Sequence, residues 1–248
     1  MLYWLAKYVF IGPLLRITCR PRVHGLENLP ETGPAILASN HLAVVDSFFL
    51  ALMVPRRLTF LAKSEYFTAP GPAGWLKKMF FAGVGQVPID RSSAQAAESA
   101  LLTGVGILRE GKLLGIYPEG TRSPDGRLYK GKSGLAILAL EAAVPVIPVV
   151  MVGTDRVNPL GSRMWRPARV EVVIGHQLDF SRYADVKDDR FVQRSVTDEV
   201  MHELMRMSGQ EYVDVYAATL KNKPADETVA ATDKAVRHTR DPAQTEDP

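Results

Sequence analysis

A histidine and an aspartate stand five residues apart in a markedly apolar stretch, ILASNHLAVVDSFFLALMV, residues 36–54. Five residues of ideal helix turn the chain by about 140°, so His41 and Asp46 would not share a face if both were helical. The spacing works if His41 lies in a turn and Asp46 in the first turn of the next helix. The carboxylate then holds one imidazole nitrogen, and the other is free to take a proton, as in a hydrolase triad. The pair is therefore a candidate general base.

The same stretch has a structural alternative, in which Ser39 or Asn40 caps the helix and His41 is merely adjacent. The sequence holds no Gly-x-Ser-x-Gly nucleophile elbow, so a basic His41 would activate a hydroxyl that arrives with the substrate. A metal-dependent hydrolase with His41 and Asp46 as ligands is a weaker alternative, because no further cluster completes a site. The other histidines are scattered at positions 24, 176, 202 and 238. We therefore expect no metal.

A second polar group follows a short apolar run at YPEGTRS, residues 117–123. Gly120 lets the backbone approach a ligand closely, and Thr121 adds a hydroxyl donor. Arg122 offers the planar fork of donors that suits a phosphate. Glu119 either hydrogen-bonds a substrate hydroxyl or holds Arg122 in place. This stretch predicts a site for an anionic substrate.

Two further basic residues stand at the ends of expected strands, Lys63 after TFLA and Arg91 after QVPID. Each alone is typical of a solvated surface charge. In an α/β sheet, however, ligands bind at the carboxyl ends of the strands. Since His41, Arg91 and Arg122 all follow expected strands, we expect them to converge on one cleft.

Short, continuous apolar segments alternate along the chain with segments of helical periodicity, and these predict the strands and helices that position the candidate residues. We expect strands within 35–39, 58–62, 86–91, 112–118, 144–153 and 168–174, and helices within 43–54, 94–109, 131–144 and 188–208. Continuous apolar strands of this kind belong in a parallel sheet covered on both faces. The predicted fold is α/β, with a mostly parallel central sheet flanked by helices and an N-terminal interfacial helical segment.

The N-terminal segment, residues 1–20, is rich in aromatic and aliphatic side chains. Lys7, Arg16 and Arg20 interrupt its apolar run short of the ~20 residues that a spanning helix needs. It also lacks the layout and cleavage site of a signal peptide. Large apolar side chains, with basic ones that can reach lipid headgroups, indicate an interfacial segment. A first helix packed on the core is the alternative.

Charge is unevenly distributed although the net charge of the 248 residues is only +3. Up to Arg91, ten Lys and Arg stand against five Asp and Glu. This favours an anionic partner, either a phosphorylated substrate or a membrane surface. An aromatic and basic cluster at 75–81 is a surface helix or a second membrane contact. No nucleic-acid partner is expected, because no dense basic stripe or binding motif occurs. The only cysteine, Cys19, excludes an intramolecular disulfide and a thiolate zinc cluster.

Four motifs together resemble the glycerolipid acyltransferase superfamily, over roughly residues 20–180. NHLAVVD (40–46) matches its Asn-His-x-x-x-x-Asp block, and GQVPIDR (85–91) resembles its second block. YPEGTRS resembles the third block and VPVIPV (144–149) the fourth, in the same order and at similar spacing.

The resemblance implies that His41 is the general base, that Asp46 orients it, and that Asn40 supports the motif or the oxyanion. It further implies an acceptor and phosphate site formed by Lys63, Arg91, Glu119, Gly120, Thr121 and Arg122. The expected domains are a membrane-interface segment over 1–20, an acyltransferase domain over 21–220, and a disordered tail over 221–248. The tail is poor in large apolar side chains.

The implied reaction moves a fatty acyl chain from a thioester to the free hydroxyl of lysophosphatidic acid, giving phosphatidic acid in phospholipid biosynthesis. Acyl-CoA or an acyl-carrier protein is the co-substrate, and no bound cofactor is expected. The implied location is monotopic, on the cytoplasmic face of the cell membrane. Glycerol-3-phosphate or another lysophospholipid is an alternative acceptor. A catalytically silent lipid-binding protein of the same fold is the alternative from another class.

Overall fold

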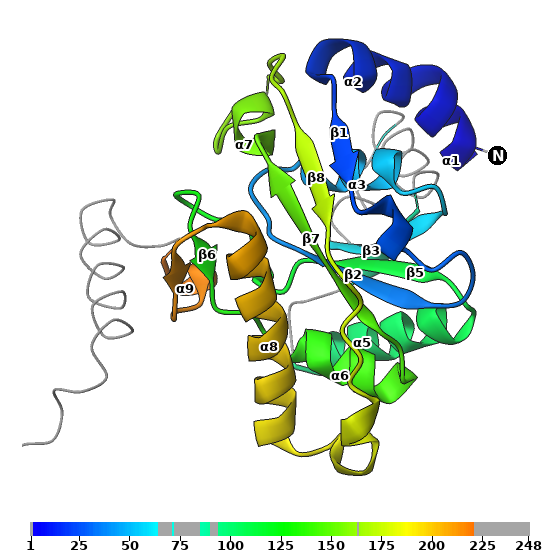
Figure 1. Ribbon diagram of the computed structural model, residues 1–248, viewed down its shortest axis with the longest axis vertical. Helices are drawn as coiled ribbons and strands as arrows, with labels where there is room; N and C mark the ends of the chain where they lie inside the picture. Colours follow the sequence, from blue (N-terminus) through cyan, green and yellow to red (C-terminus); the bar gives the residue numbers. More distant parts are fainter. Residues whose placement is uncertain (1, 64–70, 72–84, 90–93, 163, 221–248) are drawn as a thin grey trace, which may run out of the picture.

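The computed structural model describes residues 2–63, 71, 85–89, 94–162 and 164–220 (Figure 1). A seven-stranded sheet has the order β1-β8-β7-β2-β5-β3-β4. All neighbouring strands are parallel except β7 and β8, which are antiparallel. The strands are β1 (Arg22–His24), β2 (Ala35–Ser39), β3 (Leu58–Lys63), β4 (Gln86–Ile89), β5 (Leu113–Ile116), β7 (Val146–Val152) and β8 (Glu171–Ile174). The predicted mostly parallel α/β sheet is therefore confirmed.

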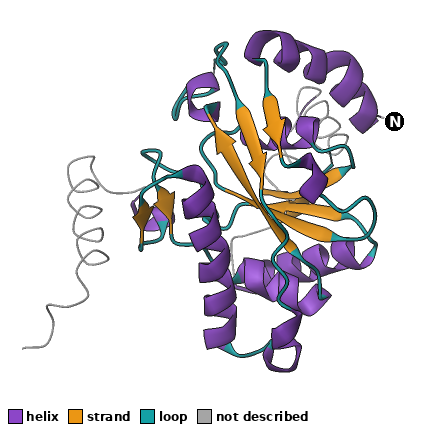
Figure 2. Cartoon of the chain, viewed as in Figure 1, coloured by secondary structure: helices purple, strands orange, loops and turns teal. Residues whose placement is uncertain are grey.

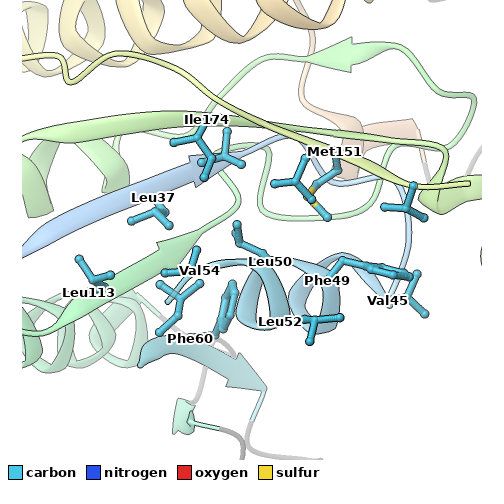
Figure 3. Close-up of a cluster of buried hydrophobic side chains, with 14 of the residues drawn as sticks. Leu37, Val45, Phe49, Leu50, Leu52, Val54, Phe60, Leu113, Met151 and Ile174 are labelled. Atoms are coloured by element: carbon cyan, nitrogen blue, oxygen red, sulfur yellow. The ribbon is translucent and has the colours of Figure 1, made fainter. Parts of the chain in front are cut away.

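Helices cover both faces of this sheet (Figure 2). They are α3 (Asp46–Met53), α5 (Ala94–Arg109), α6 (Gly134–Ala142), α7 (Thr154–Val157) and α8 (Arg190–Ser208), and short 3-10 turns span Leu26–Asn28 and Ser181–Val186. Leu37 of β2 packs in the core that includes α3, whereas Ile36 packs with α5, α6 and α8. Figure 3 shows the first of these cores, with Phe49 and Leu50 of α3 opposite the sheet. Strand β2 is buried on both sides, as its unbroken apolar sequence predicts.

The helix expected within 43–54 begins only at Asp46. The reason is local, because the Asp46 carboxylate accepts hydrogen bonds from the backbone N–H groups of Leu42 and Ala43. These bonds hold residues 41–45 as a turn in front of the helix. A second sheet of two short strands, β6 (Leu128–Tyr129) and β9 (Tyr212–Val213), was not predicted, and nor were β1, α7 and α9 (Ala217–Leu220). The predicted tail lies outside the described residues.

The N-terminal segment consists of α1 (Leu2–Leu5), a π-helical turn over Ala6–Phe10, and α2 (Ile11–Cys19). A Cβ atom on Gly12 would lie 1.7 Å from the carbonyl oxygen of Lys7, so this turn requires glycine. No helix of the described residues has the length and apolar character needed to cross a bilayer.

Lys7 does not reach outward from this segment, so that part of the interfacial prediction is wrong. Its side chain is only 7% exposed and its Nζ donates to the carbonyl oxygen of Val54 at the end of α3. Burial lowers the pKa of Lys7 to about 8. Tyr3 makes a second contact of this kind, donating to Ala51 O and accepting from Leu58 N–H. The inner face of the segment therefore fixes the end of α3.

Candidate active site

His41 and Asp46 are in direct contact. His41 Nδ1 lies 2.8 Å from Asp46 Oδ2, and the same oxygen accepts from Leu42 N–H at 2.8 Å and Ala43 N–H at 2.9 Å. An ionised carboxylate only accepts, so Nδ1 carries the hydrogen and Nε2 is left as the basic nitrogen. The Asp46 side chain is fully buried, whereas that of His41 is 18% exposed. The imidazole is thus held at Nδ1 by a buried carboxylate, while part of the His41 side chain remains accessible to solvent.

Tyr117 forms a second wall of the histidine site, which the sequence did not predict. Its ring stacks on the imidazole of His41, with centroids 3.9 Å apart and planes 13° from parallel. The Tyr117 hydroxyl lies 2.8 Å from Ser47 Oγ in the first turn of α3. Burial, with a smaller contribution from the charge of Asp46, raises the pKa of Tyr117 well above its usual value. The uncharged Tyr117 ring therefore limits rotation of the His41 imidazole by stacking on it.

Glu119 ties the two main motifs together through the backbone. Its Oε1 accepts from His41 N–H at 3.2 Å and its Oε2 from Tyr129 N–H at 3.0 Å. Ser123 N–H donates to the His41 carbonyl oxygen at 2.7 Å, which adds a second link. Glu119 is buried, and within the described part of the chain it makes no ion pair with Arg122. The geometry gives it a bracing position below the site.

Glu119 should make stability depend on pH. Burial raises the pKa of its carboxyl from 4.5 to about 8, against the opposing effect of its two backbone hydrogen bonds. Between these values the folded state keeps a proton that the unfolded state has lost, so the free energy of unfolding should fall as pH rises through this window. Urea unfolding of wild type and Glu119→Gln at pH 5 to 8.5 measures it. The wild type should lose stability relative to the variant, and parallel curves would contradict the assignment.

Asn40 braces the other side of the turn. Its Oδ1 accepts from Met151 N–H at 2.8 Å, and its Nδ2 donates to Met151 O at 3.2 Å and to Gln210 Oε1 at 2.8 Å. Gln210 in turn donates to the carbonyl oxygen of Gly126, beyond the YPEGTRS loop. With its amide engaged in this way, Asn40 fixes the end of β2 against β7 instead of presenting a donor to a substrate. Gln210 is a further positioning residue that the sequence did not reveal.

The expected phosphate site is only partly described. Gly120 has a φ of +72°, which favours glycine, and a Cβ atom there would lie 3.0 Å from Lys132 Cε and 3.2 Å from Lys132 Nζ. Lys132, which was not predicted, therefore lies over Gly120. Thr121 and Arg122 are partly exposed beside it, and their side chains make no hydrogen bond or ion pair to other described residues.

The two remaining predicted cations are not placed. Lys63 is the last residue of β3, paired in register with Ile89 of β4, and its side chain is not described. Arg91 lies outside the described residues, as does the whole of the aromatic and basic cluster at 75–81. Within the described ranges, no group of three or more His, Cys, Asp or Glu side chains gathers to hold a metal ion.

Comparison with known proteins points to one family. The profile of a family described as "Acyltransferase" matches residues 20–152. A chloroplastic 1-acyl-sn-glycerol-3-phosphate acyltransferase of Arabidopsis thaliana is 34% identical over 166 residues, covering 66% of this chain and 45% of that protein. A human 1-acyl-sn-glycerol-3-phosphate acyltransferase beta is 37% identical over 131 residues, covering 53% and 46%.

Shorter proteins align over more of their own length. The 1-acyl-sn-glycerol-3-phosphate acyltransferase of Bacillus subtilis is 29% identical over 64% of this chain and 76% of its own. The chain spans about half the length of the other curated relatives it matches. The crystal structure of the 1-acyl-sn-glycerophosphate acyltransferase PlsC from Thermotoga maritima superposes with a TM-score of 0.63 at 25% identity, covering 83% of this chain and 79% of that one.

Proposed function

The chain belongs to the acyltransferase family, and from this premise we propose that it transfers a fatty acyl chain from a thioester to the free hydroxyl of lysophosphatidic acid. The product would be phosphatidic acid, for phospholipid synthesis. The observation that carries the proposal is the contact between His41 Nδ1 and the buried carboxylate of Asp46. This contact leaves His41 Nε2 free to act as a base. The sequence near His41 offers no serine or cysteine nucleophile motif, so the hydroxyl that Nε2 activates is proposed to come from the substrate.

In the proposed reaction His41 Nε2 removes the proton from the acceptor hydroxyl as the oxygen attacks the thioester carbonyl. Asp46 stabilises the imidazolium that forms, and the Tyr117 ring keeps it in plane. The tetrahedral intermediate then collapses, the carbon–sulfur bond breaks, and the imidazolium returns the proton to the leaving thiolate. Acyl-CoA or an acyl-carrier protein supplies the thioester, and no other cofactor enters the reaction.

We assign the acceptor phosphate to the neighbourhood of Gly120. Arg122 and Lys132 supply positive charge there, and Thr121 supplies a hydroxyl. Lys130, two residues before Lys132, is already paired with Asp214 at 2.9 Å, so it is the less available of the two lysines. Lys63 and Arg91 are proposed to complete the site from the neighbouring strands.

Peripheral attachment to the cytoplasmic face of the cell membrane through the N-terminal segment is part of the same proposal. Its supporting observation is an outward face of large apolar side chains, opposite the face that packs on α3. The exposed members are Trp4, Leu5, Tyr8, Val9, Phe10, Leu14 and Ile17. A lysophospholipid resides in a membrane, so an enzyme that uses it needs such a surface.

The first test is release of the free thiol from palmitoyl-CoA by wild-type protein in detergent, with and without lysophosphatidic acid. We expect release that depends on the acceptor, because the hydroxyl is the nucleophile. Acyl-carrier-protein thioester, glycerol-3-phosphate and other lysophospholipids in parallel identify the preferred donor and acceptor. Absence of acceptor-dependent release in every combination would favour the catalytically silent lipid-binding alternative.

A further inference from the structure

A second apolar surface borders the catalytic turn, separate from the N-terminal segment. We call it the rim patch, and it consists of Val44, Val152, Leu160, Met164 and Trp165, all of them exposed. Val44 lies in the turn between His41 and Asp46, and Val152 follows Met151, whose backbone binds Asn40. The other three project from the loop between α7 and β8. The rim patch therefore begins at the catalytic turn and reaches the α7–β8 loop, where Trp165 contacts Phe48 of α3.

The loop that carries the rim patch is held in shape by its own hydrogen bonds. Asn158 Nδ2 donates to Ser162 O at 3.0 Å, and Arg166 N–H donates to Val157 O at 2.8 Å. The Trp165 ring packs edge-on against Phe48 in the first turns of α3, at 5.5 Å between centroids. Met164 nevertheless remains 75% exposed. A fixed loop that keeps large apolar side chains in water is typical of an interaction site.

The charges beside the rim patch are positive. Arg156 in α7 and Arg166 and Arg169 in the loop that follows are exposed and make no ion pair with other described residues. Asp155 in α7 is the one acidic residue among the described residues from 154 to 170. Apolar side chains with a tryptophan, flanked by arginines, match the boundary between the headgroups and acyl chains of an anionic bilayer. The N-terminal segment and the α7–β8 connection lie at the same end of the molecule (Figure 1).

We propose that the rim patch inserts into an anionic lipid surface and seats the mouth of the active site on it. The inference rests on the proposed function, since a lipid acceptor is what makes a membrane-facing mouth useful. Large apolar side chains that remain exposed, a tryptophan among them, favour a bilayer over an acidic carrier protein, which is the other partner that positive charge would attract. The rim patch would thus bring the acceptor hydroxyl to His41 directly from the bilayer.

The test is partition of the intact chain onto vesicles of equal phosphatidylglycerol and phosphatidylcholine, measured by sedimentation without any substrate. Leu160→Ser/Met164→Ser should bind roughly tenfold more weakly, because two apolar side chains no longer insert. Each of Arg156→Gln and Arg166→Gln should weaken binding roughly fivefold, and only on vesicles that contain phosphatidylglycerol. Phe191→Ser is the matched control, since Phe191 is 85% exposed and is the second residue of α8. Helix α8 begins at the end of the molecule opposite the α7–β8 connection (Figure 1).

Unchanged partition of the Leu160→Ser/Met164→Ser variant, or an equal loss in the Phe191→Ser control, would overturn the proposal. If the Leu160→Ser/Met164→Ser variant partitions as wild type but turns over an acyl-carrier-protein thioester more slowly, the rim patch is a docking surface for a protein and the proposal is wrong. Vesicle binding is measured without catalysis, so failure of the acyltransferase assay would leave this result intact.

Discussion

Replacing His41 by alanine should lower acceptor-dependent thiol release by roughly 10²- to 10⁴-fold, the usual contribution of a positioned general base. The imidazole itself contacts Asp46 through one hydrogen bond and stacks on Tyr117. The links that join the two motifs, from His41 to Glu119 and Ser123, are made by the backbone and do not involve the ring. The loss should therefore appear in the chemical step, with KM for the acceptor little changed.

The matched control is His24→Ala, because His24 is exposed at the end of β1. It should keep the wild-type rate. Thermal unfolding of both variants separates a catalytic effect from a folding defect. A His41→Ala protein that is folded and as active as wild type would refute the general-base mechanism, whichever acceptor the enzyme prefers.

The main sheet could be predicted because its strands have simple signatures. Residues 35–39 and 94–109 form a strand and a helix with the predicted bounds. Continuous apolar runs buried on both faces, separated by helical periodicity, leave few alternatives. The strands β6 and β9 have two residues each, and no periodicity can be read from so short a run. The reversed direction of β8 likewise depends on the path of its connection.

Contacts between the main motifs were harder to predict than the motifs themselves. The spacing of His41 and Asp46 restricts how they can meet, so local geometry is enough to expect their contact. Gln210 lies 170 residues from Asn40, and a lone glutamine after a helix carries no signal of such a bond. In the sequence, Tyr117 is an aromatic residue at the end of a predicted strand. Such a residue is as consistent with an ordinary core position as with a place in the active site. Lys7 is a basic residue in an apolar segment, and only packing reveals that it points inward.

Glu119 shows why a motif does not by itself reveal the task of each residue in it. Its position beside Arg122 in the sequence suggests a role at the substrate. In the fold, residues 117–123 turn at Gly120, and the Glu119 side chain passes inward to the backbone of His41 and Tyr129. A carboxyl group that orders the catalytic loops would be as necessary for activity as one that binds the acceptor.

Two substitutions of Asp46 should separate the orientation of His41 from the stabilisation of its charge. Asp46→Ala removes the acceptor for His41 Nδ1–H and for the Leu42 and Ala43 N–H groups together. The turn that places the base is lost with it, so activity should fall by roughly 10²- to 10⁴-fold, as for His41→Ala, because residues that act as one unit are not additive. The double variant should be no slower than either single one.

Asp46→Asn should be milder, because the two backbone N–H groups require an oxygen at the position of Asp46 Oδ2. The asparagine Oδ1 takes that position, so it can still accept from His41 Nδ1–H and keep the tautomer. What is lost is the negative charge opposite the imidazolium. The difference between a charge-assisted and a neutral hydrogen bond, about 1 to 1.5 kcal/mol, corresponds to roughly a tenfold lower kcat.

The order of the two Asp46 variants is therefore the informative result, measured as kcat at saturating acceptor and donor. If kcat of Asp46→Asn is well above that of Asp46→Ala, holding the imidazole ring contributes more to catalysis than stabilising its positive charge. Equal and severe losses would mean that the charge is essential to the transition state. Full activity in Asp46→Ala would contradict any role for the carboxylate, since no other described residue hydrogen-bonds to the His41 ring.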